Sequence, residues 1–168
     1  MKGKKILGMI LLIIPLCFCV TACDPPQFYR GYEKLNETVV GIELINYSNL
    51  EQKTINTTLD KNPEKKILPF EFDQMEIVET LPAEKIADFL QDYSEMFVMA
   101  SYNHPNSSNG QSIRLIYNDT TFEVISCSAK GCFIAIYAEN GKAIRYVGMT
   151  GNNDFRTIVN TYFDTKVN

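Results

Sequence analysis

Four strand-like runs that follow one another closely between Gln111 and Met149 constrain the fold more than any other feature of the sequence. Residues 112–117, 121–127, 132–138 and 142–149 show the period of two that is typical of β-strands. Only three or four residues separate one run from the next, and connections this short join antiparallel neighbours. Asn140-Gly141 favours the last hairpin, because both residues accept the positive φ of a type I′ turn. The region therefore predicts a four-stranded antiparallel meander.

Two amphipathic segments and two or three earlier strands complete the predicted fold. In residues 82–98 and in the C-terminal segment after Asp154, apolar residues recur at spacings of three and four: Ile86, Phe89, Leu90, Tyr93 and Phe97, then Phe155, Ile158, Val159, Tyr162 and Phe163. Residues 38–47, with Ile42 and Leu44 facing inward, and residues 72–80 predict strands, and residues 54–59 a weaker one. We expect an α+β fold with a mostly antiparallel sheet of five to six strands and both helices packed on one face.

The N-terminus has the pattern of an export signal. Three lysines among the first five residues precede fifteen uncharged residues, 6–20, a run shorter than the roughly 20 residues of an ordinary bilayer span. The run ends in Val20-Thr21-Ala22-Cys23, which resembles the lipobox of bacterial lipoproteins. The resemblance implies cleavage before Cys23, attachment of diacylglycerol to its thiol, and a chain held by lipid on the extracytoplasmic face of the cell membrane. A signal peptide removed without lipidation and an uncut anchor are the alternatives.

These observations predict three segments. Residues 1–22 form the lipoprotein signal peptide, residues 23–37 a tether, and residues 38–168 a single domain. The aromatic residues Phe28, Tyr29 and Tyr32 of the tether dock on the domain or rest at the membrane interface. Three of the 16 basic residues lie in the signal, so the mature chain has 13 basic and 20 acidic residues. This acidic balance, without a Lys/Arg cluster, argues against nucleic acid as a partner and leaves anchoring to the lipid.

Two cysteines remain in the mature chain beyond Cys23. Cys127 and Cys132 flank Ser128-Ala129-Lys130-Gly131, and they face each other if those four residues form a hairpin loop. A disulfide is then geometrically possible, and an exported location permits it. Two buried free thiols are the alternative. A redox site is a further alternative with less support, because the C-x4-C spacing differs from the C-x-x-C of thioredoxin-like motifs.

The sequence contains no recognisable catalytic, metal-binding or cofactor-binding motif. Its one histidine, His104, has no His, Cys or acid beside it at ligand spacing. His104 lies in the polar segment 102–111, predicted to be a loop, and this loop is the candidate binding site, through Tyr102, Asn103, His104 and Asn106. Glycosidase chemistry needs only two suitably placed carboxylates, which 20 acidic residues do not exclude.

Residues 75–163 resemble a group of small exported proteins and lipoproteins of Gram-positive bacteria. The similarity lies in MEIVETLPAEKIADFLQDYSEM, SIRLIYNDTTFEVIS and DFRTIVNTYF, and the present chain departs from the group in having Cys127 and Cys132. These motifs consist mainly of packing residues, so no functional residue is transferred. We expect a membrane-anchored, non-enzymatic module that binds a protein, peptide or envelope component. The alternative is an envelope enzyme that hydrolyses glycans with two carboxylates.

Overall fold

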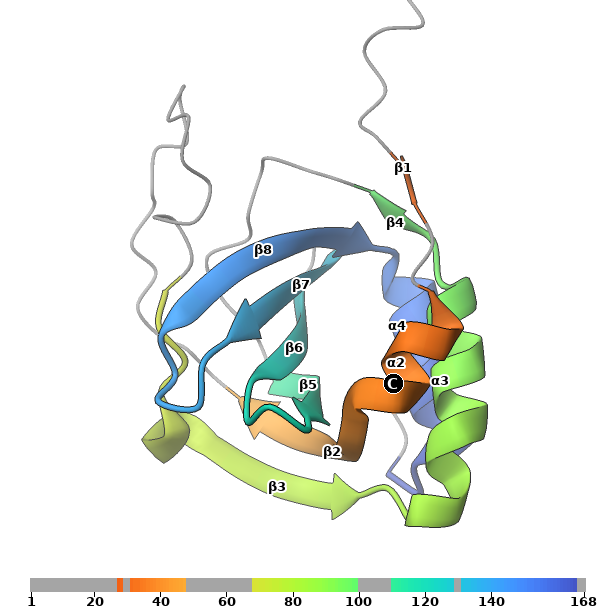
Figure 1. Ribbon diagram of the computed structural model, residues 1–168, viewed down its shortest axis with the longest axis horizontal. Coiled ribbons are helices and arrows are strands. Elements are labelled where there is room, and N and C mark those ends of the chain that lie inside the picture. The colour runs from red at the N-terminus through yellow and green to blue at the C-terminus, as the bar shows by residue number, and fades with distance from the viewer. Residues whose placement is uncertain (1–26, 29–30, 48–67, 100–109, 129–130, 166–168) are drawn as a thin grey trace, which may run out of the picture.

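One antiparallel sheet organises the protein. The computed structural model describes residues 27–28, 31–47, 68–99, 110–128 and 131–165 (Figure 1). The strand order is β1-β4-β8-β7-β6-β5-β2-β3. The strands are β1 (Gln27–Phe28), β2 (Val39–Tyr47), β3 (Met75–Thr80), β4 (Val98–Met99), β5 (Gly110–Tyr117), β6 (Phe122–Ser128), β7 (Gly131–Tyr137) and β8 (Ala143–Thr150). The helices are α2 (Tyr32–Thr38), α3 (Ile86–Glu95) and α4 (Asn152–Tyr162), and the short 3-10 turns are η2 (Phe72–Gln74) and η3 (Ala83–Lys85).

The α+β class and the antiparallel meander β5-β6-β7-β8 are confirmed. The sheet is larger than predicted, because β1 and β4 extend it beyond β8. Each of these strands has only two residues, too few to leave a periodic signal in the sequence. The run 54–59, predicted as a weak strand, lies outside the described residues.

The main core lies between the sheet and the helices, which Figure 1 shows gathered on one side of the curled sheet. Ile42 and Leu44 of β2 are fully buried there, as predicted. They meet residues of all three helices: Leu35 from α2, Phe89, Leu90 and Tyr93 from α3, and Phe155, Ile158 and Val159 from α4.

A second, smaller core covers the opposite side of the sheet. Ile45 and Tyr47 follow Leu44 on β2, and with Phe122 and Tyr137 they pack around Phe70. The Phe70 ring lies 4.3 Å from the Tyr47 ring and 5.1 Å from the Phe122 ring, centroid to centroid. The segment that leads into β3 thus covers this side of the sheet, and much of the sheet is buried on both faces.

Backbone contacts fix this covering segment to the β7–β8 turn. The Phe70 N–H donates to the Gly141 carbonyl over 2.8 Å, and Gly141 has φ +79°. A Cβ at this position would lie 2.2 Å from the Phe70 carbonyl oxygen, so the close approach requires glycine. Among the described non-glycine residues only Thr120 has a positive φ, so Asn140 does not, and the expected type I′ turn is wrong. The pairing of β7 with β8 is irregular next to this turn. In such a turn one residue with positive φ, Gly141, is enough to reverse the chain.

The segment expected to be a tether is partly folded. Residues 27–28 form β1, which pairs with β4, and most of residues 31–37 belong to α2, whose Leu35 is buried in the main core. This short helix has no run long enough to show a period in the sequence, and packing rather than propensity holds it.

Candidate binding pocket

A pocket of about 270 Å³ lies where α2 crosses the end of the meander. We call it the α2 pocket. Helix α2 forms one wall with Gly31, Lys34, Leu35 and Thr38. The β5–β6 turn forms the second wall with Tyr117, Asn118, Asp119 and Thr121, and Ile136 of β7 and Arg145 of β8 form the third. None of these residues belongs to the loop predicted to bind.

Hydrogen bonds join the two polar walls. The Asn118 N–H donates to the Thr38 carbonyl over 2.8 Å, where α2 gives way to β2. The Thr38 hydroxyl in turn donates to the Lys34 carbonyl over 2.7 Å within the helix. With Leu35 buried beneath, α2 is therefore positioned by the core on one side and by the β5–β6 turn on the other.

The turn itself is held by Asp119. Its Oδ1 accepts hydrogen bonds from the Thr121 hydroxyl over 2.6 Å and from the Thr121 N–H over 3.0 Å. These bonds, the hydroxyl first, lower the pKa of Asp119 below its usual 3.8, because they stabilise the ionised carboxylate. The carboxylate thus carries a charge at neutral pH and organises its own turn.

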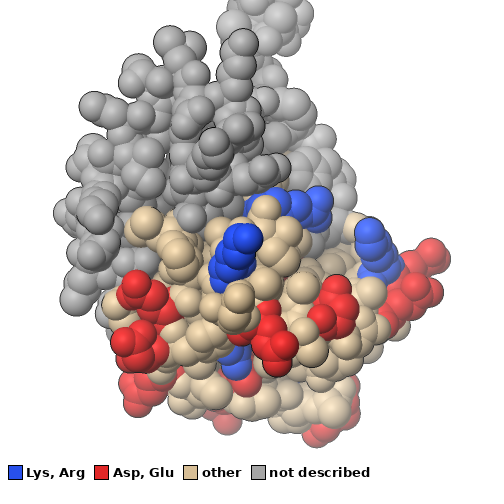
Figure 2. Space-filling view, turned by 60° about the vertical axis from the view of Figure 1, so that its left-hand side comes forward, with Lys and Arg blue, Asp and Glu red and all other residues tan. Residues whose placement is uncertain are grey.

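Two cations line the same pocket. Lys34 comes from α2 and Arg145 from β8, opposite Ile136 in the register, and both side chains are exposed. Among the described residues neither forms an ion pair. The chain as a whole has a formal net charge of −4, and Figure 2 shows acidic and basic side chains interspersed on the face it presents. A pocket with two unpaired cations and one acid is therefore locally positive in an acidic protein.

Beneath the pocket, Tyr117 contacts a buried acid. Glu123 of β6 is fully buried, and the hydroxyls of Tyr117 and Tyr93 both donate to its carboxylate, the former over 3.1 Å. Tyr93 belongs to α3, so Glu123 links a pocket-lining ring to a helix across the core. Glu123 lies two residues before Ile125 on β6, so both side chains are on the same, inward face of the strand. This alternation in the sequence could have identified Glu123 as a buried acid.

A second, acidic pocket of about 320 Å³ lies between α3 and α4. Asp92, Glu95 and Asp154 line it together with Thr157 and Thr161. Two of these acids already have local partners: Tyr162 donates to Asp92 over 2.6 Å, and Thr150 donates to Asp154 over 3.4 Å. Burial, followed by the hydrogen bond and charge of Asp92, raises the pKa of Tyr162, so its hydroxyl stays protonated and donates.

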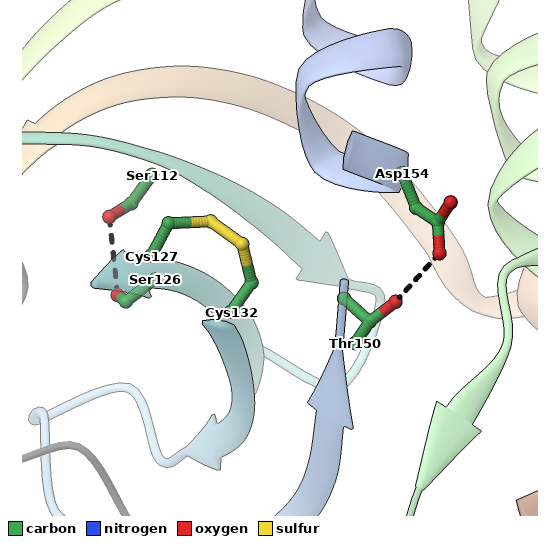
Figure 3. Close-up of a disulfide and its surroundings, with 6 residues drawn as sticks. All are labelled: Ser112, Ser126, Cys127, Cys132, Thr150 and Asp154. Carbon is green, nitrogen blue, oxygen red and sulfur yellow. Dashed lines mark hydrogen bonds between the residues drawn. A yellow bond between two sulfur atoms is a disulfide. The ribbon is translucent and has the colours of Figure 1, made fainter. Parts of the chain in front are cut away.

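The candidate residues from the sequence divide into two groups. Cys23, Tyr102, Asn103, His104 and Asn106 lie outside the described residues. Cys127 and Cys132 are directly opposite in the β6–β7 register and form a disulfide (Figure 3). The strands extend to Ser128 and Gly131, so the hairpin loop is shorter than the four residues expected. Thr150, the partner of Cys132 on β8, lies beside the start of α4, where its hydroxyl reaches Asp154 (Figure 3).

Comparison with protein-family models, curated proteins and solved structures gives no match to this chain. In the part of the chain that the structure describes, no helix is long and apolar enough to cross a membrane. Within the same residues no group of three His, Cys, Asp or Glu side chains could hold a metal ion. The fold and pocket thus define an α+β domain with a polar, locally cationic pocket.

Proposed function

We propose that this protein is a lipid-anchored binding module on the extracytoplasmic face of a bacterial cell membrane. The observation that carries the binding role is the α2 pocket, which opens to solvent and presents two cations that form no ion pair with any residue the structure describes. Its one acid, Asp119, is used to hold a turn. The Thr121 hydroxyl is hydrogen-bonded to Asp119, but the lowered pKa of this carboxyl makes it a weak base, so the arrangement is better suited to recognition than to nucleophilic catalysis.

Two observations support the location. The lipobox-like Val20-Thr21-Ala22-Cys23 supplies a thiol for the lipid. The Cys127–Cys132 disulfide fits an oxidising compartment outside the cytoplasm. The lipid would lie close to the domain, because β1 begins four residues after Cys23 and four extended residues reach at most roughly 14 Å. We therefore place the domain against the membrane surface.

The proposal includes the way in which the two long helices pack on the sheet. Helices α3 and α4 act as two amphipathic elements packed on one face of the sheet, with α2 beside them. The burial of Phe89, Leu90, Ile158 and Val159 in the main core supports this arrangement.

Detergent partitioning tests the anchor. Expressed in a bacterium with the lipoprotein-processing enzymes, the full chain should separate into the detergent phase of Triton X-114, and Cys23→Ser should move to the aqueous phase. The matched control is Cys127→Ser/Cys132→Ser, which removes two thiols but leaves the lipid site and should remain in the detergent phase. Equal partitioning of wild-type and Cys23→Ser chains that both lack residues 1–22 would refute lipid anchoring at this residue.

The acidic pocket is the one observation that favours a second candidate, a glycan hydrolase with two carboxylates. We rank it lower, because Asp92 and Asp154 have structural hydrogen-bond partners. Release of soluble fragments from purified cell-wall glycan by the wild type, lost in Asp92→Asn and in Asp154→Asn, would establish this candidate over the binding module.

A further inference from the structure

We propose that the α2 pocket binds a small hydroxylated organic anion, with a sugar acid as the representative ligand class. This inference rests on the proposed binding role and names the chemistry of its ligand. The charge of the ligand, its hydrogen-bonding groups and its size each follow from a different part of the pocket.

The negative charge of the ligand is inferred from Lys34 and Arg145. They approach the pocket from different elements, α2 and β8, and neither has an ion-pair partner among the described residues. Arg114, by contrast, is already engaged: its guanidinium contacts Glu43 with nitrogen–oxygen distances of 2.5 and 2.8 Å. An anionic group placed between Lys34 and Arg145 would supply the missing partner. The planar guanidinium of Arg145 suits the two oxygens of a carboxylate.

The hydroxyl groups of the ligand are inferred from the polar residues at and near the β5–β6 turn. Thr38, Asn118 and Thr121 already donate hydrogen bonds, to the carbonyls of Lys34 and Glu37 and to the Asp119 carboxylate. Their side-chain oxygens therefore remain as acceptors on two walls of the pocket, next to the Asp119 carboxylate. Asp119 is ionised and therefore accepts hydrogen bonds only. It would repel a second anionic group and would accept from a ligand hydroxyl. The pocket therefore favours one anionic group together with hydroxyls over a polyanion.

The size follows from the volume. About 270 Å³ is near the lower end of ligand pockets, which matches a single sugar ring or a molecule of similar size. Ile136, which is half-buried, adds apolar surface on which the C–H face of a sugar ring can rest. A long glycan could enter only by one end.

Titration of the lipid-free domain, residues 24–168, with glucuronate tests the assignment. Its soluble expression and a single cooperative unfolding transition are checked first, and the full chain in detergent replaces it if it fails either. Binding is followed by the ¹⁵N–¹H resonances of Lys34, Asn118 and Arg145 at constant ionic strength. We expect saturable shifts confined to the pocket, and about a tenfold or greater loss of affinity in Arg145→Gln and in Lys34→Gln.

Arg156→Gln is the matched control, because Arg156 is an exposed arginine of α4 that lines neither pocket. It should bind glucuronate as the wild type does. Glucose tests the charge and glucose 6-phosphate tests the kind of anion. Equal binding of glucose would overturn the charge argument, and binding of the phosphate ester alone would overturn the carboxylate assignment. Absence of all binding would overturn this inference, whereas the detergent partitioning of Cys23→Ser would still decide the anchor separately.

Discussion

At the scale of single residues, the least ordinary feature is a glutamate inside the main core. Glu123 is fully buried and is reached by the hydroxyls of Tyr93 and Tyr117. A buried polar group is tolerated only when it is hydrogen-bonded, so the three side chains form one unit. The unit connects the floor of the α2 pocket with α3.

We predict that Glu123→Ala lowers the free energy of unfolding by about 2–4 kcal/mol. The substitution leaves two tyrosine hydroxyls without their acceptor and a cavity in the core. Urea unfolding followed by far-ultraviolet circular dichroism measures the change. Glu84→Ala, at an exposed position near the start of α3, is the control and should stay within about 0.5 kcal/mol of the wild type. A loss of that same small size for Glu123→Ala would show that the buried hydrogen bonds contribute little.

Tyr137 in the second core gives a pH dependence. Burial, and then the neighbouring Tyr47, raise the pKa of its phenol above the usual 10.0. The unfolded chain therefore loses this proton at lower pH than the folded one, so the stabilisation is complete below about pH 10 and declines as the pH rises further. In Tyr137→Phe, which keeps the ring, we predict a shallower decline between pH 9.5 and 11 in urea unfolding. Parallel declines in the two proteins would contradict the raised pKa.

At the scale of elements, the segment from Leu68 to Gln74 determines how the second face of the sheet is covered. It carries Phe70 into an aromatic cluster, and its backbone is hydrogen-bonded to Gly141. Sequence periodicity predicts the strands of the meander, because repeated burial on one side leaves a repeated pattern. It places the ends of other elements less well: α3 covers Ile86–Glu95 rather than residues 82–98, and residues 72–74 of the expected strand 72–80 form a 3-10 turn. The covering segment has no such period, and its position depends on one glycine and on contacts far apart in the chain.

We predict that Gly141→Ala destabilises the protein by about 2–4 kcal/mol. Alanine is strained at φ +79°, and its Cβ would displace the Phe70 carbonyl. Thermal and urea unfolding measure the loss. Gly31→Ala is the control, because a Cβ there meets nothing within 4 Å. Equal stability of the two variants would mean that the covering segment is not held at this turn.

At the scale of the whole molecule, the sequence predicts the fold class better than the site. The α2 pocket joins residues more than 100 positions apart, Lys34 and Arg145, and each is an ordinary surface cation in its own stretch of sequence. The short helix that carries Lys34 lies in the segment expected to be a tether. Only the folded chain brings the two cations to one pocket, and the sequence alone therefore indicates the polar loop 102–111 instead. The buried Glu123 was detectable from its parity, but its tyrosine partners depend on the tertiary fold.

The central claim is that a lipid on Cys23 holds this binding domain at the membrane, and the intact mass of the mature protein tests it most directly. We predict a chain that begins at Cys23 and carries the added mass of diacylglycerol, confirmed by fragmentation of the N-terminal peptide. The Cys23→Ser protein should lack that addition. A wild-type chain that retains residues 1–22, or one that begins at Cys23 with an unmodified thiol, would contradict the account.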